Sequence, residues 1–318
     1  MNKPAAPDRQ TQAFLGAGKA AGGPPLEAMT IGEARRSIKE LMLAVGPPCR
    51  SDVDRTDLTI NGPGGLVPVA VYQPKQHRDG LRPVIFLIHG GGWALGDVES
   101  YDNTARFFCA ESDAVVVSAD YRLAPEHKFP AGLDDAYRVL EWLAENAFQW
   151  GGDKNRISIM GDSSGGNFAA VICHRARNRG GPEIWRQILL YPVLKAGEAS
   201  MFASREDFGG GDYFISSDSI QWSEGLYLSA PEQANCVEVS PILTENLAGL
   251  PPALIVTAGL DPLRDEGKAY ADKLDRAGVS VDYKCVENTI HGFMTFPAAI
   301  DAGEQALHWV ANWITRNQ

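Results

Sequence analysis

Cysteine is scarce in this sequence, and its placement excludes a disulfide-built framework. The 318 residues include five cysteines, which are far apart, show no Cys-x-x-Cys spacing and form an odd set that full pairing cannot satisfy. Neither these residues nor the six histidines indicate a metal site. We interpret the cysteines as reduced, mostly buried thiols: Cys49, Cys109, Cys173, Cys236 and Cys285.

Long apolar runs and an excess of positive charge are also lacking. No segment approaches the roughly 18 apolar residues of a membrane span, and residues 1–23 have no continuous apolar core of the signal-peptide kind. The 29 basic residues are outnumbered by 40 acidic ones, for a net charge of −11, which disfavours nucleic acid and anionic lipid as partners. We expect a cytoplasmic protein with no membrane span and no nucleic-acid partner.

The length suits one large α/β core with a modest excursion. Residues 1–23 are rich in Ala, Gly and Pro, so we expect them to be disordered or loosely held and dispensable for function. The first predicted helix begins later, because Thr30 and Glu33 match a capping box. Apolar residues then recur at helical spacing up to the break at Gly46-Pro47-Pro48.

The middle of the chain alternates short apolar runs with helix-length segments. Residues 58–60 and 66–72, separated by a glycine-rich turn, predict an antiparallel hairpin at the sheet edge. Runs this apolar are typical of parallel strands that are buried on both faces, so we predict one doubly wound α/β sheet. The remaining predicted strands are 84–88, 114–119, 157–160, 188–191, 253–257 and 279–286, and the helices are 133–148, 166–179, 266–277 and 302–315. Residues 195–235, with a glycine run and several aromatics, predict an excursion over the carboxyl end of the sheet.

One turn has the pattern of a nucleophile elbow. The segment Gly161-Asp162-Ser163-Ser164-Gly165 follows an apolar strand and precedes a predicted helix. Such a turn strains the backbone of the central serine and exposes its hydroxyl, while the small flanking residues prevent clashes between strand and helix. We predict that Ser163 is a nucleophile.

A serine hydroxyl is a poor nucleophile at neutral pH, so it needs an imidazole base and a carboxylate that orients that imidazole. Asp261 follows a predicted strand and His291 comes after the next one, which gives the order Ser, Asp, His of α/β-hydrolases. Asp265 is the rival acid, but it fits better as a cap for the helix predicted to begin near Glu266.

A glycine loop supplies candidate donors for an oxyanion. His89-Gly90-Gly91-Gly92-Trp93 follows the strand 84–88, and its glycines let backbone N–H groups approach a negative charge closely. The N–H of Ser164, beside the nucleophile, completes this hole. We interpret His89 as a structural residue that holds the loop by hydrogen bonds.

These segments resemble the signatures of the bacterial hormone-sensitive lipase family of α/β-hydrolase carboxylesterases. The match runs from about residue 66 to the C-terminus and leaves the first 25 or so residues outside. Two further segments agree with the family in order, Asp120-Tyr121-Arg122-Leu123-Ala124-Pro125-Glu126 and Asp261-Pro262-Leu263-Arg264-Asp265-Glu266-Gly267, as does His291-Gly292-Phe293.

The resemblance implies a mostly parallel eight-stranded sheet flanked by helices and covered by a helical cap. It implies that Ser163 is the nucleophile, Asp261 the acid and His291 the base, with the amides of Gly91, Gly92 and Ser164 as oxyanion donors and Gly90 supporting the turn. The family usually has alanine where this chain has Ser164, and because the backbone provides the donor we expect activity to survive. The cap would comprise an N-terminal segment within residues 1–50 and an insertion at about 195–235, and the catalytic domain would span 51–318.

We therefore expect a serine carboxylesterase that hydrolyses short- to medium-chain esters with water and needs no cofactor. An amide hydrolase uses the same triad, and relatives that lost the histidine bind small molecules without catalysis; His291 argues against the second reading here. The sequence leaves open whether the chain acts as a monomer or a homodimer. Five aromatic residues either line an acyl pocket or form the core of the cap: Trp93, Phe202, Phe208, Tyr213 and Phe214.

Overall fold

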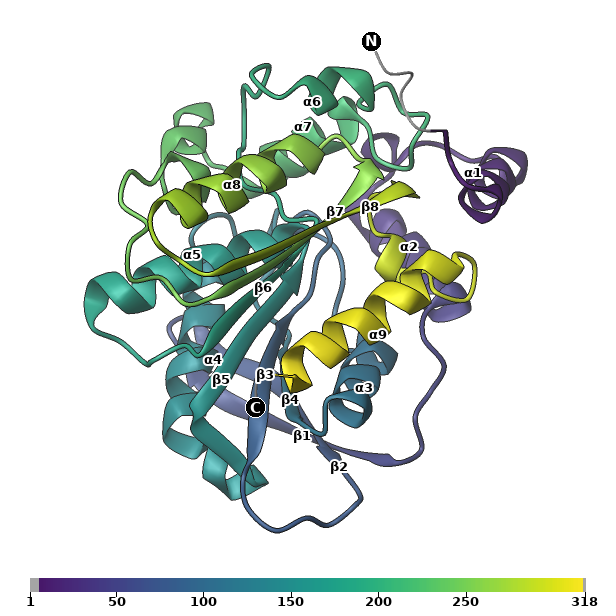
Figure 1. Ribbon diagram of the computed structural model, residues 1–318. Coiled ribbons are helices and arrows are strands. Elements are labelled where there is room, and N and C mark those ends of the chain that lie inside the picture. The colour runs from purple at the N-terminus through teal and green to yellow at the C-terminus, as the bar shows by residue number, and fades with distance from the viewer. Residues whose placement is uncertain (1–5, 317–318) are drawn as a thin grey trace.

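The computed structural model describes residues 6–316, and within them eight strands form one sheet (Figure 1). The strand order is β1-β2-β4-β3-β5-β6-β7-β8. Strand β2 runs antiparallel to both of its neighbours, and the pairs from β4 to β8 are parallel, which confirms the predicted edge hairpin and parallel core. The bounds are β1 Val53–Gly62, β2 Gly65–Pro74, β3 Arg82–Ile88, β4 Val115–Ala119, β5 Gly152–Asp162, β6 Arg186–Leu190, β7 Ala253–Leu260 and β8 Val281–Ile290.

Helices cover both faces of the sheet (Figure 1). Alternate residues of β3 show the two layers: Phe86 belongs to the apolar cluster under α4, α5 and α8, whereas Ile85 belongs to the cluster under α3 and α9. Both side chains are buried, as a central parallel strand requires. These five helices are α3 Asp102–Glu111, α4 Ala131–Asn146, α5 Ser164–Arg179, α8 Arg264–Arg276 and α9 Asp301–Thr315.

Helix α3 was not among the predicted helices. It has ten residues, and its N-cap Tyr101 makes no side-chain capping bond, so the usual start signal is missing. Its buried face, which includes Phe107 and Phe108, packs on the sheet and beside α9. Tertiary packing rather than a local signal therefore defines this helix.

The expectation of a loosely held N-terminus is wrong for residues 8–21, while residues 1–5 lie outside the described part of the chain. Helix α1 (Arg9–Ala21) begins where the Asp8 carboxylate accepts the N–H of Thr11 at 2.7 Å. Its Phe14 stacks on Phe296, with ring centroids 5.0 Å apart, and lies 6.0 Å from the ring of Phe214. An apolar side of the helix is thus packed, despite a composition that resembles a disordered tail.

Helices α2, α6 and α7 lie near the carboxyl ends of the parallel strands (Figure 1). Helix α2 begins with the predicted capping box, in which Thr30 and Glu33 bond reciprocally. Helices α6 and α7 belong to the predicted excursion, and α6 contacts α8 at the end that follows the Asp261 turn. The bounds are α2 Ile31–Val45, α6 Ala203–Asp207 and α7 Ser217–Tyr227, with short 3-10 helices η1 Leu26–Ala28, η2 Ala147–Trp150, η3 Pro231–Asn235, η4 Pro241–Leu243 and η5 Phe293–Thr295.

No cysteine among the described residues is paired, and the expectation that the thiols are mostly buried is wrong: Cys109 and Cys173 are buried, Cys236 and Cys285 are half-buried and Cys49 is exposed. Burial raises the pKa of the Cys285 thiol to about 11, so this thiol is protonated at neutral pH. No helix within residues 6–316 combines the length and apolar character that crossing a membrane requires.

Candidate active site

Ser163 occupies a strained turn between β5 and α5. Its backbone has φ 53° and ψ −119°, a conformation that side-chain-bearing residues rarely adopt. The turn is so tight that a Cβ atom on Gly161 would lie 2.3 Å from the Gly165 carbonyl oxygen, and one on Gly165 would lie 2.1 Å from the Ile88 carbonyl oxygen. Only glycine fits at these two positions, which explains the elbow motif physically.

Three side chains form a hydrogen-bonded relay at the carboxyl edge of the sheet. His291 Nε2 lies 2.9 Å from Ser163 Oγ, and His291 Nδ1 lies 2.8 Å from Asp261 Oδ2. Asp261 is completely buried and His291 is 6% exposed, so water competes little for these bonds. The structure thus brings together the three residues predicted as nucleophile, acid and base.

The local structure fixes the positions of Asp261 and His291. Asp261 follows β7 directly, and its Oδ1 accepts the N–H of Leu263 at 2.8 Å, which leaves Oδ2 for the imidazole. His291 follows β8, and the ring of Tyr191 meets the imidazole edge to face at 5.0 Å. Tyr191 was not predicted, although it follows β6 at the same sheet edge, where the ends of parallel strands meet.

The glycine loop after β3 has an unusual backbone. Gly91, Gly92 and Trp93 all have positive φ, at 113°, 58° and 59°. Within the described residues, the amides of Gly91 and Gly92 donate to no protein acceptor, and the Ser164 amide stands at the N-terminus of α5, where N–H groups have no helical partner. These are the three predicted oxyanion donors, and the structure places them on the two segments that meet beside Ser163.

Two buried side chains hold the first residue of that loop. The N–H of Gly90 donates to Asp162 Oδ1 at 2.9 Å and also lies 3.1 Å from the hydroxyl oxygen of Tyr101. The Tyr101 hydroxyl in turn donates to Asp162 Oδ2 at 2.9 Å. Burial raises the pKa of Asp162 to about 6, even though the bond from Tyr101 and the nearby His291 oppose this shift. Tyr101 was missed, because nothing near it in the sequence marks a site.

His89 takes no part in the relay. Its Nδ1 lies 2.9 Å from the carbonyl oxygen of Gly90 and 3.2 Å from the Tyr121 hydroxyl, and its ring stacks on that of Tyr121. Burial lowers the pKa of His89, which keeps the ring neutral. These contacts agree with the structural role that we inferred from the sequence.

A cavity lies over Ser163 and His291, and its volume is about 930 Å³ when the solvent-open space at its entrance is included. Of the five aromatic residues proposed for a pocket, Trp93 and Phe214 line it. The other three lie outside the described lining. Phe208 packs edge to face on Tyr213 at 5.5 Å, and Phe202 is buried before α6, so these three belong to the packing of the excursion. Apolar lining residues that were not predicted include Leu26, Ile38, Met42, Ile220, Trp222 and Phe296.

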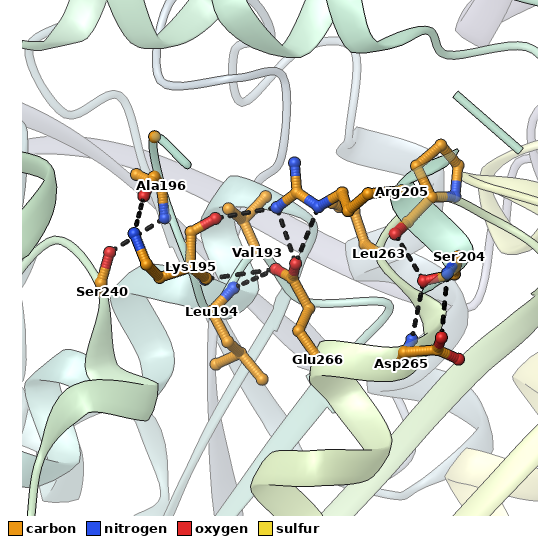
Figure 2. A network of polar contacts seen from close by, with 12 residues as sticks. Val193, Leu194, Lys195, Ala196, Ser204, Arg205, Ser240, Leu263, Asp265 and Glu266 are labelled. Atoms are coloured by element: carbon orange, nitrogen blue, oxygen red, sulfur yellow. Dashed lines mark hydrogen bonds and ion pairs between the residues drawn. The ribbon is translucent and has the colours of Figure 1, made fainter. Parts of the chain in front are cut away.

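Asp265 lies four residues beyond Asp261, and within the described residues it forms no hydrogen bond with His291. Figure 2 shows Asp265 beside Ser204 instead. The prediction that it caps its own helix is wrong, because α8 begins at Arg264 without a side-chain cap. Asp265 Oδ2 instead accepts the N–H of Ser204, in the first turn of α6, at 2.9 Å. The carboxylate therefore joins α8 to the excursion.

Comparisons with known proteins agree with this architecture. A family model described as alpha/beta hydrolase fold matches residues 85–295. The carboxylic ester hydrolase LipN of Mycobacterium tuberculosis is 41% identical over 81% of this chain and 68% of its own, and the ethyl acetate hydrolase of Pseudomonas putida is 31% identical over 92% of each. The structure of a hyperthermophilic esterase from Pyrobaculum calidifontis superposes with a TM-score of 0.91 at 37% identity and covers 98% of both chains. The chain therefore belongs to the α/β-hydrolase fold family, among the carboxylesterases of the hormone-sensitive lipase type that its motifs resemble.

Proposed function

We propose that this protein is a serine carboxylesterase that acts through an acyl-enzyme. The observation that carries the proposal is the unbroken relay from Ser163 through His291 to Asp261. Ser163 Oγ attacks the ester carbonyl carbon while its proton passes to His291 Nε2, and the tetrahedral oxyanion accepts hydrogen bonds from Gly91, Gly92 and Ser164 amides.

The second half of the reaction reuses the same groups. The protonated imidazole gives its proton to the leaving alkoxide, which departs as the alcohol and leaves the acyl group on Ser163. A water molecule then attacks the acyl carbon, His291 takes its proton, and the acid product leaves with Ser163 Oγ reprotonated. Buried Asp261 holds His291 in the tautomer whose Nε2 can accept a proton. The Asp261 carboxylate also stabilises the imidazolium that forms in both halves of the reaction.

We infer that the substrates are esters with short to medium acyl chains. The lining of the cavity over Ser163 is mostly apolar, as in other small-molecule sites. The name of the ethyl acetate hydrolase relative supports a short acyl group. A lipid surface would favour a continuous exposed apolar patch, whereas the large exposed apolar side chains lie in different elements: Leu43, Leu66, Leu81, Phe148, Met201 and Val237.

We also infer that residues 1–50 and the insertion at about 195–235 form a cap over the catalytic domain of residues 51–318. Leu26 and Met42 from the first segment, and Phe214 and Trp222 from the second, all line the cavity, which supports this division. The five free thiols support a cytoplasmic location, where thiols stay reduced.

A panel of p-nitrophenyl esters from acetate to palmitate tests the proposal. We expect hydrolysis of the acetate, butyrate and hexanoate esters and a steep decline in rate for longer chains. Ser163→Ala should lower turnover by a factor of about 10⁴ to 10⁶ while the protein remains folded. A variant that kept more than a tenth of wild-type turnover would refute Ser163 as the nucleophile. Fastest hydrolysis of palmitate would refute the substrate class alone.

Two further arms of the experiment address the alternatives. The matching p-nitroanilides report amide hydrolysis, which the same triad permits, and we expect them to react far more slowly than the esters. A p-nitrophenyl phosphonate should attach covalently to Ser163, because its phosphoryl oxygen occupies the oxyanion site. Folded protein that takes no label, as mass spectrometry of the Ser163 peptide would show, would instead favour a small-molecule binder.

A further inference from the structure

The side chain of Ser164 makes a contact that its backbone role does not require. Its hydroxyl oxygen accepts the N–H of Trp93 at 3.1 Å. Ser164 is completely buried and Trp93 is 2% exposed, so water cannot readily replace this bond. The bond joins the first residue of α5 to the last residue of the glycine loop.

The glycine loop is therefore held at both ends by the two neighbours of the nucleophile. Asp162, before Ser163, accepts the N–H of Gly90, and Ser164, after it, accepts the N–H of Trp93. The amides of Gly91 and Gly92 lie between these two anchors in the chain. Within the loop, the Gly91 carbonyl oxygen also accepts the N–H groups of Ala94 and Leu95 at 3.2 and 2.8 Å, which restrains the peptide that carries the Gly92 N–H. Because glycine backbones have wide conformational freedom, the directions of the Gly91 and Gly92 N–H groups depend on these bonds together with the two anchors.

We propose that the Ser164 hydroxyl is a positioning residue for the oxyanion hole. Ser164 then contributes twice, since its own N–H is one donor and its hydroxyl fixes the loop that carries the other two. The proposal rests on the esterase function proposed above. An alanine, the residue that the family usually has here, provides the same N–H but cannot accept the proton of Trp93.

Other contacts of Trp93 show what loss of the hydroxyl would leave behind. The carbonyl oxygen of Trp93 accepts the N–H of Ala124 at 2.9 Å, and its indole stacks on Tyr227 of α7 at 4.5 Å with an interplanar angle of 5°. The loop therefore stays in place without the hydroxyl but loses its side-chain anchor at the Trp93 end. The expected effect is smaller than the 10²- to 10³-fold loss that follows removal of an oxyanion donor, and we expect about tenfold.

Steady-state kinetics of Ser164→Ala on p-nitrophenyl butyrate test the proposal. We expect kcat to fall about tenfold with little change in KM, because less precisely placed oxyanion donors stabilise the transition state less but affect binding of the ester little. The affinity for a butyl trifluoromethyl ketone, whose Ser163 adduct places an oxyanion in the hole, should fall by the same factor. Ser158→Ala is the matched control, because Ser158 is a buried serine of β5 whose hydroxyl has no hydrogen-bond partner within the described residues.

A direct readout of the bond removes any dependence on turnover. Protein labelled with ¹⁵N-tryptophan gives one backbone amide signal for each of the seven tryptophans, and the Trp93→Phe variant identifies the signal of Trp93. The Trp93 amide proton should exchange slowly with solvent in the wild type and much faster in Ser164→Ala. Equal exchange in both proteins would overturn the proposal whatever the activity, as would a Ser164→Ala enzyme with wild-type kcat and ketone affinity. A wild type that hydrolyses no ester would refute the proposed function alone, because ketone affinity and exchange still decide the role of the hydroxyl.

Discussion

Arg205 of α6 forms an ion pair with Glu266 of α8 through two hydrogen bonds, and this contact joins the excursion to the helix that follows Asp261 (Figure 2). Its Nε and Nη2 donate to Glu266 Oε2 at 3.0 and 2.6 Å. Glu266 is completely buried, and its Oε1 accepts the backbone N–H groups of Leu194 and Lys195. Beside this pair, Ser204 Oγ donates to the carbonyl oxygen of Pro262, the residue next to Asp261. Helix α6 thus supports the turn that carries Asp261.

Arg205→Met should destabilise the protein by about 3 to 5 kcal/mol, because it leaves a buried carboxylate without its counter-ion. Burial already raises the pKa of Glu266, and Arg205 opposes that shift. The double variant Arg205→Met with Glu266→Gln should recover part of the loss, since no buried charge remains. Urea unfolding measures each free energy.

Lys268→Met provides the control for this prediction. Lys268 pairs with Asp272 on the same helix, but both side chains are about half exposed, at 51% and 49%. Such a pair contributes at most about 1 kcal/mol. If Arg205→Met cost no more than Lys268→Met, the buried pair would have no stabilising role.

Asp261→Asn should lower turnover by roughly 10⁴, because an asparagine holds His291 in the wrong tautomer. Asp265→Asn should leave kcat within a few-fold of the wild type and lower the melting temperature, since Asp265 contacts α6 and Arg264 rather than the imidazole. Esterase kinetics and thermal unfolding on both variants separate the two effects. Reversed effects would assign the acid to Asp265.

Stability should depend on pH through Asp162. Its folded-state pKa, about 6, lies above the ordinary value of 3.8, so between these values the folded state binds more protons than the unfolded state. The free energy of unfolding that Asp162 contributes is therefore fully present below about pH 4 and is lost as the pH rises through 6, by roughly 3 kcal/mol. Asp162→Asn lacks this titration, so the wild type should lose stability relative to the variant between pH 4 and 7. A difference in urea midpoint that stayed constant over this range would contradict the prediction.

The sequence could predict that Ser163, Asp261 and His291 lie together, because position along a parallel strand decides this. Ser163, Asp261 and His291 each follow a strand of the parallel core, and the carboxyl ends of such strands meet at one edge. The glycine loop was found for the same reason, since it follows β3. The partners that hold these groups could not be found in this way. Tyr101 precedes a helix without a start signal, and Asp265 bonds to a segment 61 residues away, so both depend on tertiary packing.

The same limit explains the error over the N-terminus. Residues 6–23 have the composition of a tail, and the apolar side chain that anchors them, Phe14, is separated by most of the chain from its partner Phe296. Composition alone contains no information about that pairing. Conversely, Phe208 and Tyr213 are aromatic and lie in the predicted excursion, yet they pack on each other rather than in the cavity.

Helix α1 should affect substrate binding although none of its residues lines the described cavity. Phe14 packs against Phe214 and Phe296, and both of these rings do line it. Phe14→Ala should therefore loosen that wall and raise KM for p-nitrophenyl hexanoate about threefold to tenfold, with a smaller effect on kcat, because the triad and oxyanion donors stay in place. Removal of residues 1–21 should act in the same direction and at least as strongly. Phe148→Ala is the matched control, since Phe148 is 64% exposed and lies in η2, outside the cavity lining. If Phe14→Ala and the truncated protein kept the wild-type KM, α1 would be a stabilising helix with no influence on the pocket, and the sequence-based expectation that this segment is dispensable for function would hold after all.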